Sequence, residues 1–293
     1  MKKIILIVSA ALVALAAGCK QQTSEEILAS FEENINTYVT DYRESVKEVK
    51  NNTTLTDEQK SKKIENLEKT LYEKVVKAGK EIIRDDPSNV EVVPSVLGNI
   101  YPYMEEDDLA ELLASLSEAV KEDKLVANLS ESMAAKKATA VGRKFKNFTV
   151  DHVAGVDAEG NPIYEKKSLS DYVGKGKVML VDFWSPWCPP CKAELPNIKA
   201  VWEKFHGDDF DVLSVAVWEE SRKMDWRNTI DTAKVYGVTW NQLNNGHREP
   251  ASLYGIDGIP HMVLFGKDGT ILKRGDDLRG ENLAKAVAEV LGR

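Results

Sequence analysis

Cys188 and Cys191 are separated by two prolines and are preceded by Trp187 and an apolar run. Two thiols at this spacing can close a small disulfide. A helix that begins between them lets only the first sulfur face solvent as a nucleophile. These residue types at this spacing therefore indicate thiol–disulfide exchange.

The direction of exchange depends on the start of that helix. Backbone N–H groups and the helix dipole favour the Cys188 thiolate at this end. Pro190 has no N–H that could face the Cys188 sulfur, which leaves mainly the amide of Cys191. Fewer donors stabilise the thiolate less, and a less stabilised dithiol form is a better reductant. The sequence therefore predicts a protein that is poised to reduce its substrates.

The third cysteine, Cys19, follows a positively charged start and an apolar segment over residues 4–17. This segment is shorter than the about 20 apolar residues that span a bilayer, and it is typical of a secretory signal. Small residues before the cysteine resemble the lipobox of bacterial lipoproteins. The resemblance implies a signal peptide over residues 1–18 and a lipid on Cys19 that anchors the protein to a membrane. Simple cleavage nearby is the alternative.

Composition limits the classes of protein that remain. A chain of 293 residues with 43% hydrophobic content can form two modest domains. The formal charge of −8 argues against a nucleic-acid partner, which would need a basic face. A closed zinc site needs four ligands, and no second cysteine pair or nearby histidine pair accompanies the motif. We therefore expect no metal and no cofactor, and a purely structural disulfide is the alternative for the pair.

The N-terminal half is predicted to be helical. Apolar residues recur at spacings of three and four over residues 24–50 and again from Thr56 to Asp85, with a capping box at Thr56 and Gln59. The short connection predicts an antiparallel helical hairpin. Shorter helices are expected over residues 90–101, 105–120 and 124–133, and a linker or a frayed helix end over residues 134–140. We therefore assign residues 19–140 to a helical N-terminal domain.

The pattern changes at Val141, where apolar β-branched runs begin to alternate with helical ones. The run Val178–Trp184 is typical of a central strand that is buried on both faces. Further strands are expected over residues 210–218 and in a hairpin over residues 262–273, and helices over residues 192–205, 226–236 and 281–291. This order predicts an α/β sandwich with a mixed sheet over residues 141–293.

The motif Trp187–Cys191 after the strand, together with Gly258-Ile259-Pro260 before a later strand, resembles the thioredoxin superfamily. The similarity is closest to the TlpA/ResA-type extracytoplasmic thiol–disulfide oxidoreductases, notably Bacteroidetes lipoproteins often grouped with the AhpC/TSA peroxiredoxins. It covers residues 141–293 and implies a thioredoxin-like fold. The first helical hairpin departs from the β-rich module common in those relatives, so its role is not inherited.

The resemblance implies roles for two acids beside the redox disulfide of Cys188 and Cys191. Asp182 matches a buried acid that accepts the proton of the resolving thiol, Cys191. A carboxylate in an apolar strand costs several kcal/mol unless it is protonated or bonded, which also favours a function; a salt-bridged structural acid is the alternative. Glu194 matches an active-site glutamate, and a solvated helical residue is the alternative.

The resemblance also implies a substrate groove. Pro260 is expected to follow a cis peptide bond after Ile259, in a turn that lies against the sulfurs. The backbone before this proline pairs with substrate as an added strand in the family. Trp187 and Ile259 are expected to form the apolar rim of the groove.

The resulting functional expectation is an enzyme of the cell envelope, periplasm-facing or attached to the outer membrane, that reduces protein disulfides. An upstream membrane electron donor is implied. Some relatives act on apocytochromes in cytochrome c maturation and others act more broadly, so the substrate stays open. A thiol peroxidase is one alternative, although residues 185–187 lack the threonine that such a site needs. A non-enzymatic lipoprotein whose helical half binds a partner is another.

Overall fold

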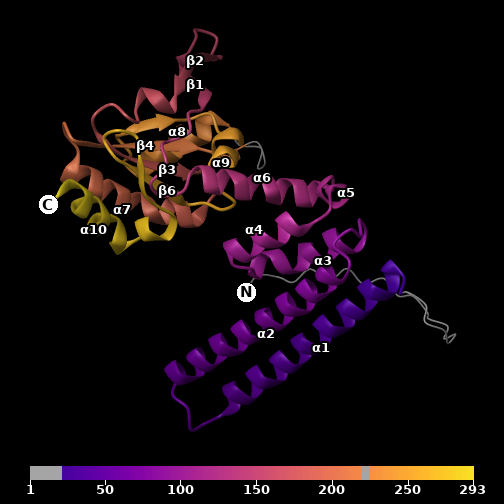
Figure 1. Cartoon of the computed structure of the whole chain (residues 1–293). Helices are drawn as coiled ribbons and strands as arrows, with labels where there is room; N and C mark the ends of the chain where they lie inside the picture. The colour runs from indigo at the N-terminus through magenta and orange to yellow at the C-terminus, as the bar shows by residue number, and fades with distance from the viewer. Residues whose placement is uncertain (1–21, 220–224) are drawn as a thin grey trace. The chain divides into compact units, whose positions relative to one another are not determined.

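The computed structural model describes residues 22–219 and 225–293 (Figure 1). The chain divides into two compact units, Met1–Ser130 and Glu131–Arg293. The predicted signal peptide over residues 1–18 and the predicted lipid attachment at Cys19 lie outside the described residues, and the expected domain boundary after residue 140 remains a prediction. Within the described ranges, no helix combines the length and the apolar character that a membrane span requires.

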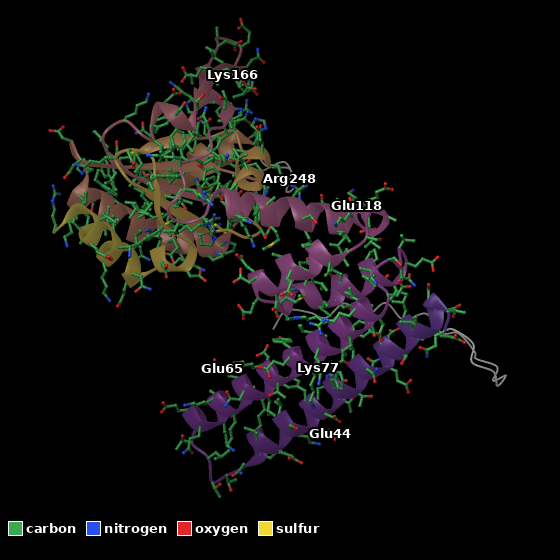
Figure 2. The ribbon with its side chains drawn as sticks, in the orientation of Figure 1. Glu44, Glu65, Lys77, Glu118, Lys166 and Arg248 are labelled. Atoms are coloured by element: carbon green, nitrogen blue, oxygen red, sulfur yellow. A yellow bond between two sulfur atoms is a disulfide. The ribbon has the colours of Figure 1, made fainter. Side chains whose placement is uncertain are left out.

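The first unit is built on two long helices, α1 (Ser24–Asn51) and α2 (Asp57–Asp85), which pack against each other (Figure 1). Each helix begins with a capping box, and the box at Thr56 and Gln59 confirms the expectation from the sequence. Only one stripe of each helix is buried, as amphipathic periodicity predicts, whereas charged residues such as Glu44, Glu65 and Lys77 are exposed (Figure 2). The predicted helical hairpin is therefore present.

Shorter helices follow, and one expectation about them is wrong. The elements are α3 (Val92–Ile100), the 3-10 helix η1 (Tyr101–Tyr103), α4 (Glu106–Ser115), α5 (Glu118–Lys121) and α6 (Lys124–Ala138). The helix expected over residues 105–120 is interrupted, because Ser117 begins a new helix by accepting a hydrogen bond from the Val120 N–H. The run expected to be a linker or a frayed helix end is the end of a helix, which continues as far as Ala138 because alanine and lysine are strong helix formers.

The second unit contains a five-stranded mixed sheet with the strand order β5-β4-β3-β6-β7. Strands β3 (Val178–Trp184), β4 (Phe210–Ala216) and β5 (Asn241–Leu243) are parallel, whereas β6 (His261–Phe265) and β7 (Ile271–Arg274) are each antiparallel to the strand before them in this order. Helices α7 (Pro189–Phe205) and α10 (Glu281–Leu291) share one buried cluster with the sheet. A mixed sheet flanked by helices, preceded by an all-α region, confirms the predicted thioredoxin-like α/β fold.

The remaining elements surround this sheet. A separate antiparallel hairpin, β1 (Thr149–Val156) and β2 (Pro162–Ser168), encloses a turn over residues 157–161. The other elements are η2 (Leu169–Asp171), α8 (Trp226–Val235), α9 (Glu249–Leu253) and η4 (Gly275–Leu278). Strand β5 and helix α9 had no counterpart among the expected elements, because three and five residues are too few to show a hydrophobic period.

Strand β3 is the central strand and is buried along its whole length. Successive side chains of a strand point to opposite faces of the sheet. Leu180 and Trp184 belong to the cluster that includes α7 and α10, so Asp182, halfway between them, lies on the same face. Strand β3 therefore places Asp182 on the face that is covered by the helix after the cysteines.

The hairpin between β6 and β7 turns at Gly269, and here the glycine is required. Its φ is 79°, a left-handed conformation, and a Cβ atom would lie 2.6 Å from Cδ1 of Phe145. Gly160 in the β1–β2 turn has a φ of 84°, but a Cβ atom there would meet nothing within 4 Å. Both glycines therefore have a left-handed backbone, but only at Gly269 would a Cβ atom also collide with a neighbouring side chain.

We predict that both Gly269→Ala and Gly160→Ala destabilise the second unit by about 1–2 kcal/mol through the left-handed backbone. Gly269→Ala should cost more, because Phe145 must also move. Urea denaturation followed by tryptophan fluorescence measures this, since all six tryptophans lie at residue 184 or later. Equal losses in the two variants would contradict the contact with Phe145.

Candidate active site

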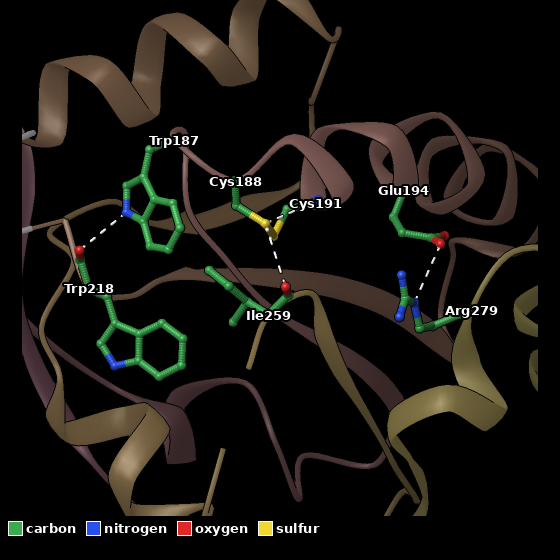
Figure 3. The surroundings of a disulfide bond; sticks show 7 residues. All are labelled: Trp187, Cys188, Cys191, Glu194, Trp218, Ile259 and Arg279. Atoms are coloured by element: carbon green, nitrogen blue, oxygen red, sulfur yellow. Dashed lines mark hydrogen bonds and ion pairs between the residues drawn. A yellow bond between two sulfur atoms is a disulfide. The ribbon is translucent and has the colours of Figure 1, made fainter. Parts of the chain in front are cut away.

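Cys188 and Cys191 form a disulfide in the structure, with their Cα atoms 5.3 Å apart. It lies where the chain leaves β3 and enters α7 (Figure 3). Helix α7 begins at Pro189, three residues before the expected start, because proline is well suited to the first turn of a helix. The Cys191 N–H donates a hydrogen bond of 3.2 Å to the Cys188 sulfur, as the sequence predicts.

Both cysteines are buried in this disulfide form, with exposed fractions of 2% for Cys188 and 1% for Cys191. The expectation of a solvent-facing first sulfur is therefore wrong for the oxidised protein. The reason lies in the loop before β6, where the Ile259 carbonyl oxygen is 3.6 Å from the Cys188 sulfur. Ile259 precedes Pro260 through a cis peptide bond, which confirms the expected conformation of this loop.

Three apolar side chains gather on one side of the disulfide, namely Trp187, Trp218 and Ile259 (Figure 3). All three are half-buried. The Trp187 indole N–H donates a hydrogen bond of 3.2 Å to the Trp218 carbonyl oxygen. The sequence-predicted rim, Trp187 and Ile259, is therefore brought together beside the sulfurs, and Trp218 extends it.

Trp218 was not among the site residues that we predicted from the sequence. It follows the end of β4 and belongs to no spaced motif. Its φ of 59° lies in the left-handed region, which bulky residues rarely adopt without support from their surroundings. The hydrogen bond from Trp187 supplies part of that support. Only the path of the chain after β4 reveals this residue.

Asp182 is the buried acid of the site, with an exposed fraction of 1%. Its Oδ2 accepts a hydrogen bond of 3.3 Å from the Ser214 hydroxyl. Its Oδ1 has no hydrogen-bond partner, and the carboxyl forms no ion pair with any residue that the structure describes. The pKa of Asp182 is raised to about 7, mainly by burial and also by the charge of Glu194, against the opposing effect of the Ser214 hydrogen bond. The salt-bridged alternative therefore does not fit.

Glu194 is also largely buried and not a solvated helical residue. Its Oε2 accepts hydrogen bonds from the Asn197 amide at 2.9 Å and from the Gly280 N–H at 3.1 Å. Its Oε1 lies 3.7 Å from Nε of Arg279 (Figure 3). Glu194 therefore joins α7 to the start of α10, and it acts on Asp182 through its charge.

No group of three or more histidine, cysteine, aspartate or glutamate residues is placed to hold an ion in the part of the chain that the structure describes.

Comparisons with known proteins concern the second unit. Residues 141–274 match the AhpC/TSA family. The thiol-disulfide oxidoreductase ResA of Geobacillus thermodenitrificans is 28% identical, over 47% of this chain and 70% of that protein. The ResA protein of Bacillus subtilis is 27% identical, over 48% of this chain and 69% of that protein.

Among solved structures, the thioredoxin domain of a thiol-disulfide oxidoreductase from Bacteroides vulgatus is 26% identical, with a TM-score of 0.39, over 51% of this chain and 96% of that one. A thiol:disulfide interchange protein from Bacteroides sp. is 25% identical, with a TM-score of 0.40, over 53% of this chain and 93% of that one. The second unit belongs to the TlpA/ResA-type thiol–disulfide oxidoreductases of the thioredoxin superfamily.

The chain is thus a thiol–disulfide oxidoreductase, and its geometry divides the requirements of exchange among different elements. Helix α7 carries both sulfurs, the cis-proline loop covers them, and β3 holds a carboxyl on the face that α7 packs against. Oδ2 of Asp182 accepts a hydrogen bond from Ser214, and Oδ1 has no hydrogen-bond partner among the described residues. A buried acid with an open oxygen and a raised pKa can take up a proton from a thiol near neutral pH.

The buried acid makes a pH-dependent prediction for the stability of the oxidised oxidoreductase. An unfolded aspartate ionises near pH 3.9, whereas the pKa of Asp182 in the folded protein is about 7. Below the unfolded value both states are protonated, and between the two values only the unfolded state ionises. Unfolding therefore releases a proton from Asp182 between these two pH values, and the free energy of unfolding falls as the pH rises. The stability that Asp182 contributes in its protonated form is fully lost once the pH has risen through about 7.

We predict that Asp182→Asn removes this loss and makes the oxidised protein more stable at pH 8 by roughly 2–4 kcal/mol. The gain should shrink at pH 5, where folded wild-type Asp182 is protonated. Urea denaturation of both proteins at the two pH values measures the difference. The pKa of Glu219 is also raised, but this group is unchanged in the variant and largely cancels. A gain that does not depend on pH would contradict the raised pKa of Asp182.

Proposed function

We propose that this oxidoreductase reduces disulfides of protein substrates outside the cytoplasm, using Cys188 and Cys191. The observation that carries this proposal is the disulfide at the start of α7, with the cis-proline loop against its first sulfur. That arrangement pairs a redox-active group with a backbone edge that an extended peptide can join. Protein disulfides are therefore the substrate class that fits the site.

The reaction begins from the dithiol. The Cys188 thiolate attacks one sulfur of a substrate disulfide, whose S–S bond breaks and releases the other substrate sulfur as a thiolate. Cys191 then attacks the mixed disulfide at Cys188, and its proton passes to Asp182. The second substrate thiolate leaves and the Cys188–Cys191 disulfide forms. Two electrons have passed to the substrate, and a donor at the membrane must return the dithiol form.

The apolar rim supports recognition of an extended peptide. Ile259 and Pro260 present the backbone edge, and Trp187 lies beside the sulfur that attacks. Trp218 adds a second indole to the same side. Disulfide-containing proteins are the proposed partners, and apocytochromes before haem attachment are one candidate within this class on family resemblance.

We further propose the domain assignment and location that the sequence predicts. Residues 1–18 form a signal peptide, residues 19–140 a helical domain and residues 141–293 the redox domain. Cys19 carries the lipid that holds the protein in the cell envelope. The support for this is the apolar segment at residues 4–17 and the small residues before Cys19.

The match of residues 141–274 to the AhpC/TSA family supports a second candidate, a thiol peroxidase. Such a site needs a threonine and an arginine near its cysteine, and Ser185, Pro186 and Trp187 precede Cys188 here. Two vicinal thiols fit exchange better. Consumption of hydrogen peroxide by the reduced full chain, faster than by a Cys188→Ser control, would favour the peroxidase.

We predict that the full chain catalyses the reduction of insulin by dithiothreitol, measured by the turbidity of the released chains. Cys188→Ser should return the reaction to the uncatalysed rate, because no nucleophile remains. Cys191→Ser should accumulate a mixed disulfide with substrate, visible by mass spectrometry. Cys19→Ser, which keeps both active-site thiols, should retain the full rate and serves as the matched control. Full activity of Cys188→Ser would refute the assignment.

We also predict a reducing midpoint potential, well below the about −120 mV of a strong periplasmic oxidant. Pro190→Ala should raise it by tens of mV, because position 190 is the second residue of α7, where a restored N–H can face the Cys188 sulfur and stabilise the thiolate. Pro189→Ala is the matched control, since the first N–H of a helix does not serve its cap. Titration against glutathione or dithiothreitol buffers measures all three proteins. A wild-type potential near that of the strong oxidant would contradict the proposed direction.

A further inference from the structure

Ser214 lies directly opposite Asp182 in the parallel ladder between β3 and β4. Trp240 immediately precedes β5, the next strand on the other side of β4. Its indole N–H donates a hydrogen bond of 2.9 Å to the Ser214 hydroxyl oxygen, which in turn donates one of 3.3 Å to Oδ2 of Asp182. All three side chains are buried. A continuous chain of hydrogen bonds therefore leads from Trp240 to the acid.

The chemistry of these groups allows the hydrogen bonds to run in one direction only, from Trp240 to Ser214 to Asp182. An indole N–H can only donate, so the Ser214 oxygen must accept at that end. A hydroxyl has a single proton, and accepting from Trp240 leaves that proton free for Asp182. Oδ2 is thereby occupied, while Oδ1 has no hydrogen-bond partner among the described residues. Oδ1 is the oxygen left to receive a proton.

We propose that Trp240 and Ser214 are positioning residues for the resolution step, holding the Asp182 carboxylate so that Oδ1 accepts the proton of Cys191. This inference rests on the proposed role of Asp182 in that step. It adds two residues from outside the cysteine motif and names the oxygen that is used. Neither residue touches substrate, so each acts through Asp182.

The surroundings of Asp182 explain why this chain of hydrogen bonds affects the ionisation of the carboxyl group. From α7, the charge of Glu194 disfavours the ionised carboxyl, and burial does the same. Arg279 forms an ion pair of 3.7 Å with Glu194, while β6 places the uncharged Met262 opposite Asp182. The two cysteines lie in the buried cluster on this face. Ser214 is the group among the described residues that favours the carboxylate.

The test uses the full chain with Cys19→Ser in every protein, reduced and mixed with 5,5′-dithiobis(2-nitrobenzoic acid). Attack by Cys188 releases one thionitrobenzoate anion, and resolution by Cys191 releases the second, so the two steps appear as two absorbance phases. Rates are measured between pH 5 and pH 9. The first phase reports the nucleophile and the second reports proton transfer to Asp182.

We expect Ser214→Ala to slow the second phase about tenfold at pH 7 and to move its pH profile upward, because losing a donor disfavours the carboxylate. Trp240→Phe should move the profile in the same direction by less, since the hydroxyl remains but can turn away. The first phase should change by less than about twofold in both, because an acid outside the attack step has little effect on it. Ser214→Thr, which keeps the hydroxyl, should restore the profile.

Trp202→Phe is the matched control. The Trp202 indole also donates a hydrogen bond to an aspartate, Asp211, at 3.1 Å, and it packs at the edge of the same buried cluster. Its loss should leave both phases unchanged. Circular dichroism and the unchanged first phase show that each variant is folded, and if Trp240→Phe does not fold, Ser214→Ala carries the test.

Asp182→Asn separates the two levels of the proposal. If it leaves the second phase and its pH profile unchanged, the role of Asp182 in resolution is wrong and the proposed mechanism fails with it. If Asp182→Asn slows the second phase but Ser214→Ala leaves the profile in place, Asp182 keeps its role and the positioning by Ser214 and Trp240 is refuted. A shift in Ser214→Ala that Ser214→Thr does not reverse would also refute it.

Discussion

The arrangement of the site depends on one carboxyl group that is held in an apolar interior. Asp182 stands in the centre of β3, between Leu180 and Trp184 on the face covered by α7. An isolated carboxylate there would be strongly disfavoured, and the protein supplies one hydrogen bond and no opposite charge from the described residues. The acid is therefore kept close to the point where it changes its protonation state, which is what proton transfer needs.

The order of strands explains why the other parts of the site meet at β3. Its parallel neighbour β4 places Ser214 beside the acid and then leads to Trp218 on the rim. Its antiparallel neighbour β6 begins just after the cis-proline loop, which brings Ile259 to the first sulfur. The chain leaves β3 directly into α7, so the cysteines start the helix that packs over Asp182. Three adjacent elements thus converge on one strand end.

The sequence was informative where function is local. The cysteine spacing and the buried run before it placed the nucleophile and the acid, and family resemblance placed the cis peptide bond before Pro260. Contacts between distant segments were not accessible, because Ser214 meets Asp182, and Trp240 meets Ser214, only through the pairing of strands, which short apolar runs do not define. The burial of Cys188 in the disulfide form depends on the loop around Ile259 and was missed for the same reason.

The energetic cost of burying Asp182 is also the source of its usefulness. Moving a proton from a thiol with a pKa of about 8.5 to an ordinary aspartate with a pKa of about 3.9 is uphill by roughly 6 kcal/mol. With the pKa of Asp182 raised to about 7, the same transfer is uphill by only about 2 kcal/mol. The charge of Glu194, which is held in place by Arg279 and Gly280, contributes to this raised pKa after the larger effect of burial. The same burial that lowers the stability of the fold at neutral pH therefore brings the acid closer to its partner thiol.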